Sequence, residues 1–160
     1  MDIPAVIKAP TFEHEMKPSA LDEYLAAARS ALVRLEPENA YAATQRGALL
    51  IDIRSEFQRR RDGEARGAII VERNHLEWRL HPDSAARIPE ATSADVEWIL
   101  LCDEGYASSL AAAVLQTLGL HRATDVVGGF QAWQAAGMPL GPPGEVNAPR
   151  LAPEPGSLGK

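Results

Sequence analysis

The sequence predicts an α/β fold, a single domain whose central, mostly parallel sheet carries helices on both of its faces. Short apolar runs alternate along the chain with segments of helical periodicity, and this alternation is typical of parallel sheets. The chain has 160 residues, of which 46% are hydrophobic and 24% charged, a composition typical of one soluble globular domain. Its single cysteine excludes an intramolecular disulfide, and a chain of this length builds a hydrophobic core without one.

We expect three regions along the chain. Residues 1–18 show little periodicity and are interpreted as an irregular arm. Residues 19–140 contain all the segments with clear strand or helix patterns and form the predicted domain. Residues 141–160 hold five prolines and four glycines with no apolar period, so we expect a flexible tail there.

An extra helix is expected at 19–35, ahead of the first strand. Its apolar residues recur at spacings of three and four and share one helical face: Leu21, Leu25, Ala28, Leu32 and Leu35. Ser19 and Asp22 have the spacing of a helix N-cap. Pro37 suits the first turn of a second helix over 38–45. The role of the first helix stays open, because it either covers the sheet or meets a partner.

Four short apolar runs predict buried strands. They cover 48–53, 67–71, 98–102 and 124–127. A strong helix is predicted over 108–120, between the third and the fourth run. A last helix is predicted over 129–137, where Gly137 and Pro139 end it.

Polar groups at the ends of two strands are the candidates for chemistry, because ligands of parallel sheets bind beyond the carboxyl ends of the strands. Asp52 and Arg54 follow the first strand, and Cys102 ends the third. The loop 103–108 joins Cys102 to the next helix, so backbone N–H groups and the positive end of that helix can face the sulfur. This arrangement favours the thiolate form of a cysteine. Gly105 supplies the backbone freedom of a tight loop.

At this point the sequence resembles the rhodanese-like sulfurtransferases. The active-site loop of that family is similar to the segment CDEGYASS at 102–109, in which a glycine follows the cysteine by three positions and a helix begins just beyond. Three further segments resemble family signatures and come in the right order: LLIDIR at 49–54, GAIIVERNHLEWRL at 67–80 and VVGGFQAWQAAGMP at 126–139. The resemblance covers roughly residues 35–140.

The resemblance implies an α/β fold and a cysteine that accepts sulfane sulfur as a persulfide and passes it to a thiophilic acceptor such as cyanide or a thiol. By position, it implies that Cys102 is the nucleophile. It also implies a substrate-binding loop of six residues: Asp103, Glu104, Gly105, Tyr106, Ala107 and Ser108. Asp52 and Arg54 would support the loop. No cofactor or metal is implied, and the partners would be a small sulfur donor or acceptor, or a protein persulfide or thiol.

The loop departs from the family pattern in its charge. Many family members with good thiosulfate activity carry an arginine where this chain has Ala107. Asp103 and Glu104 instead oppose a negative sulfur and repel an anionic donor. We therefore expect thiosulfate to be a poor donor. Arg73, two residues past the second strand, is the candidate for a compensating cation.

Two other kinds of function stay open on the residues alone. A phosphatase or arsenate reductase uses a related cysteine loop, but it needs a longer loop and an arginine that clamps the oxyanion. Ala107 and Ser108 stand where that arginine is expected. A non-catalytic binding or regulatory module would keep the fold and carry Cys102 as a buried structural residue.

Charge and hydropathy exclude several partners. The chain has 16 basic and 22 acidic residues and a net charge of −6, which argues against a nucleic-acid binder. No apolar run reaches the roughly 20 residues of a membrane helix, and the N-terminus lacks the pattern of a secretory signal. We therefore expect a cytoplasmic protein with a reduced thiol and no membrane partner. A homodimer is among the open oligomeric states.

Overall fold

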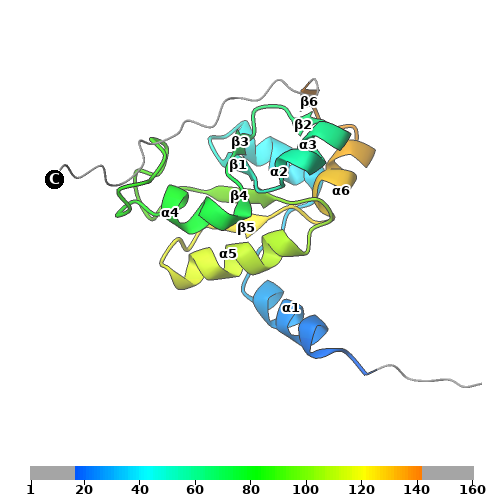
Figure 1. Cartoon of the computed structure of the whole chain (residues 1–160), viewed down its shortest axis with the longest axis horizontal. Coiled ribbons are helices and arrows are strands. Elements are labelled where there is room, and N and C mark those ends of the chain that lie inside the picture. Colours follow the sequence, from blue (N-terminus) through cyan, green and yellow to red (C-terminus); the bar gives the residue numbers. More distant parts are fainter. Residues whose placement is uncertain (1–16, 142–160) are drawn as a thin grey trace, which may run out of the picture.

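The structure is a computed structural model that describes residues 17–141. A four-stranded sheet lies at its centre in the order β3-β1-β4-β5, and all of its strand pairs are parallel. The strands are β1 (Leu49–Asp52), β3 (Ile69–Ile70), β4 (Trp98–Leu101) and β5 (Thr124–Asp125). Each lies within one of the four predicted runs, so the parallel α/β fold is confirmed (Figure 1).

Helices connect these strands, and a small second sheet adds to the fold. The helices are α1 (Ala20–Ser30), α2 (Pro37–Thr44), α3 (Glu56–Asp62), α4 (Leu76–Leu80), α5 (Ala107–Thr117) and α6 (Gly129–Ala135), with a 3-10 turn at Arg73–His75. The second sheet pairs β2 (Glu64–Ala65) with β6 (Leu140–Gly141) in antiparallel fashion. The sequence predicted α2, α5 and α6 to within three residues at each end. The sequence did not predict α3, α4 or the second sheet.

Helices cover both faces of the central sheet, as expected. α4 and α5 lie on one face, and α2 and α6 lie on the other (Figure 1). Successive side chains of a strand point to opposite faces, so each strand feeds two cores. Ile51 and Leu100 join the core under α4 and α5. Leu50 and Ile99 join the core under α2 and α6, where Trp133 is fully buried.

The predicted helix at 19–35 is wrong in its C-terminal part, because α1 ends at Ser30. Leu35 instead forms a parallel bridge with Val126, beside β5. The N–H of Leu35 donates to the carbonyl oxygen of Asp125 (3.0 Å), and its own carbonyl accepts from the N–H of Val127 (2.9 Å). Pairing with the sheet thus replaces the last turns of the expected helix.

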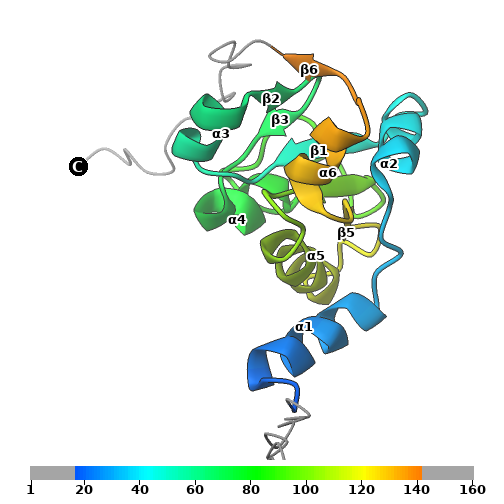
Figure 2. The same cartoon turned by 90° about the vertical axis from the view of Figure 1, so that its right-hand side faces the viewer.

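α1 packs on the outer side of α5, so that α5 lies between α1 and the sheet (Figure 2). Its predicted N-cap is confirmed: the N–H of Asp22 donates to Ser19 Oγ (3.1 Å), and the N–H of Ser19 donates to Asp22 Oδ2 (3.0 Å). The hydroxyl and the N–H of Ser19 lower the pKa of the Asp22 carboxyl below its ordinary value. No residue of α1 is buried.

The described part of the chain contains no helix that is both long and apolar enough to cross a membrane. The expected arm at 1–18 and the expected tail at 141–160 lie outside the described residues, except for Lys17, Pro18 and Gly141.

Candidate active site

Cys102 lies at the carboxyl end of β4 and begins the loop that leads to α5. The residue is 6% exposed. Its Sγ accepts hydrogen bonds from the N–H of Gly105 (3.1 Å) and from the N–H of Ser108 (3.4 Å). The sulfur therefore lies in a cradle of backbone donors next to the first turn of α5, and such a cradle stabilises negative charge on sulfur.

Two glycines allow this loop to pack closely against the start of α6. Gly105 has a φ of 84°, and a Cβ added there would lie 2.7 Å from the backbone nitrogen of Gly128. A Cβ on Gly129 would lie 2.5 Å from the carbonyl oxygen of Cys102. The close approach lets the N–H of Phe130 donate to that carbonyl (2.7 Å). The first turn of α6 thus holds the beginning of the loop.

A buried polar cluster lies beneath the sulfur. The thiol of Cys102 donates to Ser108 Oγ (3.1 Å), and the Ser108 hydroxyl donates to Asp125 Oδ2 (2.7 Å). The hydroxyl of Ser109 donates to the same carboxylate oxygen (2.9 Å). Ser108, Ser109 and Asp125 have no exposed surface. The sulfur of Cys102 is therefore linked through the hydroxyl of Ser108 to the carboxylate of Asp125, at the end of β5.

The sequence did not point to Asp125 or to the arginine that pairs with it. Arg34 Nε contacts Asp125 Oδ1 at 2.8 Å, and Arg34 Nη2 contacts Asp125 Oδ2 at 3.1 Å. A charged residue inside the predicted strand 124–127 was a usable signal, because a buried charge needs a partner. The partner itself could not be found, since 91 residues separate it from Asp125.

A pocket of about 510 Å³ opens in front of the loop. It is lined by Ile53, Arg54, Ser55, Gln58, Arg73, Cys102, Asp103, Glu104, Tyr106 and Ala107. The structure thus brings together most of the candidate site residues named from the sequence. Asp52 does not line the pocket, and Gly105 and Ser108 lie behind it as donors to the sulfur.

Asp52 and Arg54 form a buried ion pair at the edge of this pocket. Arg54 Nη2 lies 2.7 Å from Asp52 Oδ2 and donates to the carbonyl oxygen of Gly63 (2.8 Å). Its guanidinium also stacks over the ring of Phe130, 3.7 Å from the ring centre. These contacts join the end of β1 to α6, and the supporting role of both residues stays a prediction.

The charged side chains around the pocket are only partly paired. Asp103 accepts from Gln131 (3.0 Å) and lies 3.5 Å from Arg61, so its charge is partly compensated away from the sulfur. Glu104 is exposed and has no ion-pair partner among the described residues. Arg73 lines the pocket, as expected for a compensating cation, but it also pairs with Glu77 (2.6 Å).

Comparison with known families identifies the class of protein that this fold and loop represent. The family model of the rhodanese-like domain matches residues 36–136, which begin just before α2 and end just after α6. The chain therefore belongs to the rhodanese-like domain family, as the resemblance of its loop and strands implied.

Curated relatives share this domain. The chain is 30% identical over 104 residues to a protein named thiosulfate sulfurtransferase GlpE from Pseudomonas savastanoi, covering 64% of this chain and 87% of the relative. The protein of the same name from Actinobacillus succinogenes is 30% identical over 111 residues, with 69% of this chain and 91% of the relative covered. These relatives support a sulfurtransferase family for this chain.

Solved structures show the same fold. A protein of unknown function from Rhodopseudomonas palustris, described as a possible tyrosine phosphatase, is 28% identical with a TM-score of 0.69, and the match covers 88% of this chain and all of that one. The polysulfide-sulfur transferase homodimer from Wolinella succinogenes is 22% identical with a TM-score of 0.59, over 74% of this chain and 84% of that one.

Proposed function

We propose that this protein is a sulfurtransferase that carries sulfane sulfur as a persulfide on Cys102. The observation that carries the proposal is the position of Sγ, at the base of a pocket and 3.1 Å from the N–H of Gly105. A persulfide places negative charge on its outer sulfur, and backbone donors around the loop are suited to bind it. The names of the curated relatives point to the same reaction class.

The reaction proceeds in two transfers of one sulfur atom. The Cys102 thiolate attacks the outer sulfur of a donor such as thiosulfate, a bond forms between the two sulfurs, and sulfite leaves with the electron pair of the broken S–S bond. An acceptor such as cyanide then attacks the outer sulfur of the persulfide. Thiocyanate leaves and the Cys102 thiolate is restored, so neither transfer requires a cofactor.

The natural donor is proposed to be neutral or borne by a protein, with thiosulfate a poor substitute. Glu104 contributes an uncompensated carboxylate to the pocket, while Arg73 shares its charge with Glu77. An anionic donor therefore approaches against like charge. The proposed partners are a small persulfide or a protein persulfide or thiol, and the proposed compartment is the cytoplasm, where a single thiol stays reduced.

Mass spectrometry of the purified chain tests the sulfur carrier directly. Incubation with a sulfane donor should add about 32 Da, one sulfur atom, to the peptide that contains Cys102, and a thiol or cyanide should remove it. Cys102→Ser should lose both the adduct and the transfer activity while keeping the parent's melting temperature. Equal transfer by the variant and the parent would exclude Cys102 as the carrier.

A phosphatase is the second candidate, because the similar Rhodopseudomonas palustris protein is described as a possible tyrosine phosphatase. The loop 103–108 contains no arginine, and the nearest pocket cations are Arg54 and Arg73 on other elements. A phosphate in the loop would therefore lack the clamp that such enzymes use. Hydrolysis of p-nitrophenyl phosphate that depends on Cys102, without any persulfide formation, would favour this candidate.

A further inference from the structure

Two arginines that precede the matched domain meet at the carbonyl oxygen of Gly105 in the active-site loop. Arg29 lies in the last turn of α1, and its Nη2 donates to that oxygen at 2.8 Å. Arg34 lies between α1 and α2, and its Nη2 donates to the same oxygen at 3.0 Å. Both residues lie outside the family match at 36–136. The family signatures therefore do not account for these contacts.

We propose that Arg29 and Arg34 are positioning residues, which hold the loop so that its backbone N–H groups face the sulfur of Cys102. The inference rests on the proposed function in taking this sulfur as the reacting atom. It assigns a role to α1, which contributes no buried residue to the core.

The conformation of Gly105 explains why the loop needs these anchors. Glycine adopts positive φ at no steric cost, so its own backbone preference does not fix the orientation of the adjoining peptides. The carbonyl of Gly105 is instead fixed by two donors, Arg29 and Arg34, and the hydroxyl oxygen of Ser109 lies 3.2 Å away. Gly105 donates its own N–H to Sγ of Cys102 (3.1 Å), and the N–H of Ser108, three residues on, donates to the same sulfur (3.4 Å), so anchoring this carbonyl holds the segment that carries both donors.

Arg34 acts on the sulfur by a second route, through Asp125. This carboxylate is fully buried and accepts from the hydroxyl of Ser108, whose oxygen lies 3.1 Å from Sγ. Without a cation, a buried carboxylate here would oppose negative charge on the sulfur. Arg34 compensates that charge with two contacts of 2.8 and 3.1 Å.

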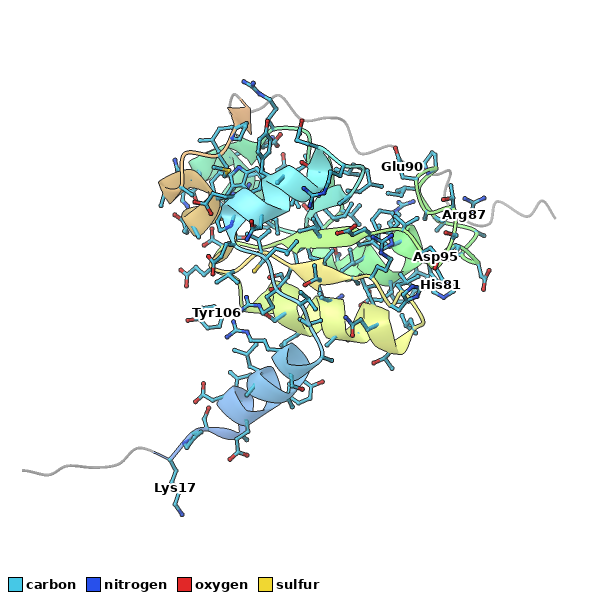
Figure 3. All side chains as sticks on the ribbon, turned by 180° about the vertical axis from the view of Figure 1, so that it is seen from behind. Lys17, His81, Arg87, Glu90, Asp95 and Tyr106 are labelled. Carbon is cyan, nitrogen blue, oxygen red and sulfur yellow. The ribbon has the colours of Figure 1, made fainter. Side chains whose placement is uncertain are left out.

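Arg29 also contacts the side chain that forms one wall of the pocket. Its guanidinium carbon lies 5.5 Å from the ring centre of Tyr106, and its Nε donates to Ser109 Oγ (3.0 Å). Figure 3 shows Tyr106 beside the start of α5, on the side from which α1 extends. Arg29 of α1 thus contacts a carbonyl and a ring of the loop and a hydroxyl in the first turn of α5.

Alkylation of Cys102 by iodoacetamide tests the inference without any sulfur donor. Cys102 is the only cysteine, so the modified atom is known. The alkylation rate at pH 7 divided by the plateau rate at high pH reports the fraction of Cys102 present as thiolate. This ratio is insensitive to changes in how easily iodoacetamide reaches the sulfur. Arg29→Gln should lower this ratio roughly three- to tenfold, less than the full loss of a charged hydrogen bond, because Arg29 acts on the sulfur only through the loop. Arg29→Lys should recover part of it.

Matched variants separate positioning from stability and from loss of charge. Arg66→Gln removes an exposed arginine between β2 and β3, away from the loop, and should keep the parent's ratio. Arg34→Gln leaves Asp125 without its cation and risks misfolding. We therefore use Arg34→Lys in place of Arg34→Gln, since lysine keeps the charge but cannot form the same two contacts with the carboxylate. Arg34→Lys should lower the ratio of alkylation rates while its melting temperature stays close to the parent's.

Two results decide the inference. If Arg29→Gln and Arg34→Lys fold like the parent and keep its ratio, the arginines do not position the loop and the proposal is wrong. If the ratio falls in both variants, the proposal is supported. In that case, absence of persulfide on the parent with every sulfane donor would count against the proposed function alone, because alkylation needs no donor.

Discussion

The hydroxyl of Ser108 lies between two groups that compete for its single proton. It donates to Asp125 (2.7 Å), and its oxygen lies 3.1 Å from Sγ of Cys102. When the sulfur becomes a thiolate, a hydroxyl can rotate to donate to it instead. Asp125 then keeps its contacts with Arg34 and Ser109. The carboxylate therefore tolerates the loss of one donor.

Ser108→Ala should slow the uptake of sulfur by Cys102 roughly ten- to a hundredfold, since a hydrogen bond to a charged group contributes about 1.5–3 kcal/mol and 1.36 kcal/mol is tenfold in rate. Single-turnover formation of the persulfide measures the effect. Ser109→Ala is the comparison variant, because it removes a donor to Asp125 and the contacts with Arg29 and the Gly105 carbonyl, but no contact with the sulfur. Equal losses in both variants would mean that the support of Asp125 and the loop, and not the contact with Sγ, is responsible.

A second prediction concerns Glu64, a buried carboxyl in β2. Burial raises the pKa of Glu64 above its ordinary value of 4.5, and Arg59, 3.6 Å away, only partly offsets this. The folded chain therefore binds the proton of the Glu64 carboxyl more tightly than the unfolded chain does. The stability that this proton binding contributes is present below pH 4.5 and is lost as pH rises through the folded pKa. Glu64→Gln removes the titration, and its stability relative to the parent should increase from pH 4 to pH 7. Urea unfolding of both proteins across this range measures the difference, and a constant difference would contradict the assignment.

The site residues that the sequence revealed are those that lie close together along the chain. Cys102 and its loop are contiguous, and Asp52 and Arg54 are two positions apart, and their places at strand ends and the resemblance to the family singled them out. Asp125, Arg34 and Arg29 lie in segments distant from the loop along the chain, and their local sequence gives no indication of these contacts. Only the packing of α1 on α5 and the bridge from Leu35 to Val126 bring them together.

Among the elements, those that bury an apolar face were predictable, and the short polar ones were not. The strands and α5 carry apolar runs or periods that burial requires. α3 has seven residues with no apolar period, and its one sequence signal is the capping box of Ser55 and Gln58. α4 has five residues, too few for a period to be visible. The expected helix at 19–35 failed for the opposite reason, since its apolar spacing continued into a segment that pairs with the sheet.

α1 depends on its cap more than the other helices do. A helix of 11 residues is marginal in water, and this one buries no side chain. Ser19→Ala removes the hydroxyl that accepts from the N–H of Asp22. Loss of an N-cap is expected to lower protection from hydrogen exchange roughly fivefold in α1. Because Arg29 lies in the last turn of this helix, transfer activity should fall with it. Hydrogen exchange of the α1 amides and the rate of persulfide formation measure these two effects.

The same helix should loosen in the parent as pH falls. Ser19 lowers the pKa of Asp22. The contribution of the ionised Asp22 to the stability of α1 is therefore present above the ordinary value of 3.8 and is lost as pH falls through the folded pKa. Exchange in α5 serves as the internal control. Equal loss of protection in α1 and α5 would indicate global destabilisation and not fraying of α1.

At the scale of the whole molecule, the fold gathers the site at one edge of the sheet. The carboxyl ends of β1 and β4 meet there, and the first turns of α5 and α6 hold the loop from either side. Arg29 of α1 and Arg34, which follows α1, add two positive charges from outside the matched domain next to a loop that carries two negative ones. The charge around the sulfur is therefore set by segments far apart in the chain, in a molecule with a net charge of −6.

This distribution of charge leads to the last prediction, on thiosulfate as a donor. Like charges a few ångströms apart near a protein surface oppose one another by up to about 4 kcal/mol, and solvent screens most of this. Glu104 has no ion-pair partner among the described residues, whereas Asp103 lies beside Arg61 and Gln131. Glu104→Gln should therefore raise the rate with thiosulfate roughly three- to tenfold at low salt, and the gain should shrink in 0.5 M salt. Asp103→Asn is the control with a smaller effect, and a neutral persulfide donor should respond to neither variant. If Glu104→Gln leaves the thiosulfate rate unchanged at low salt, the carboxylate does not face the incoming donor and the charge of the loop does not select against it.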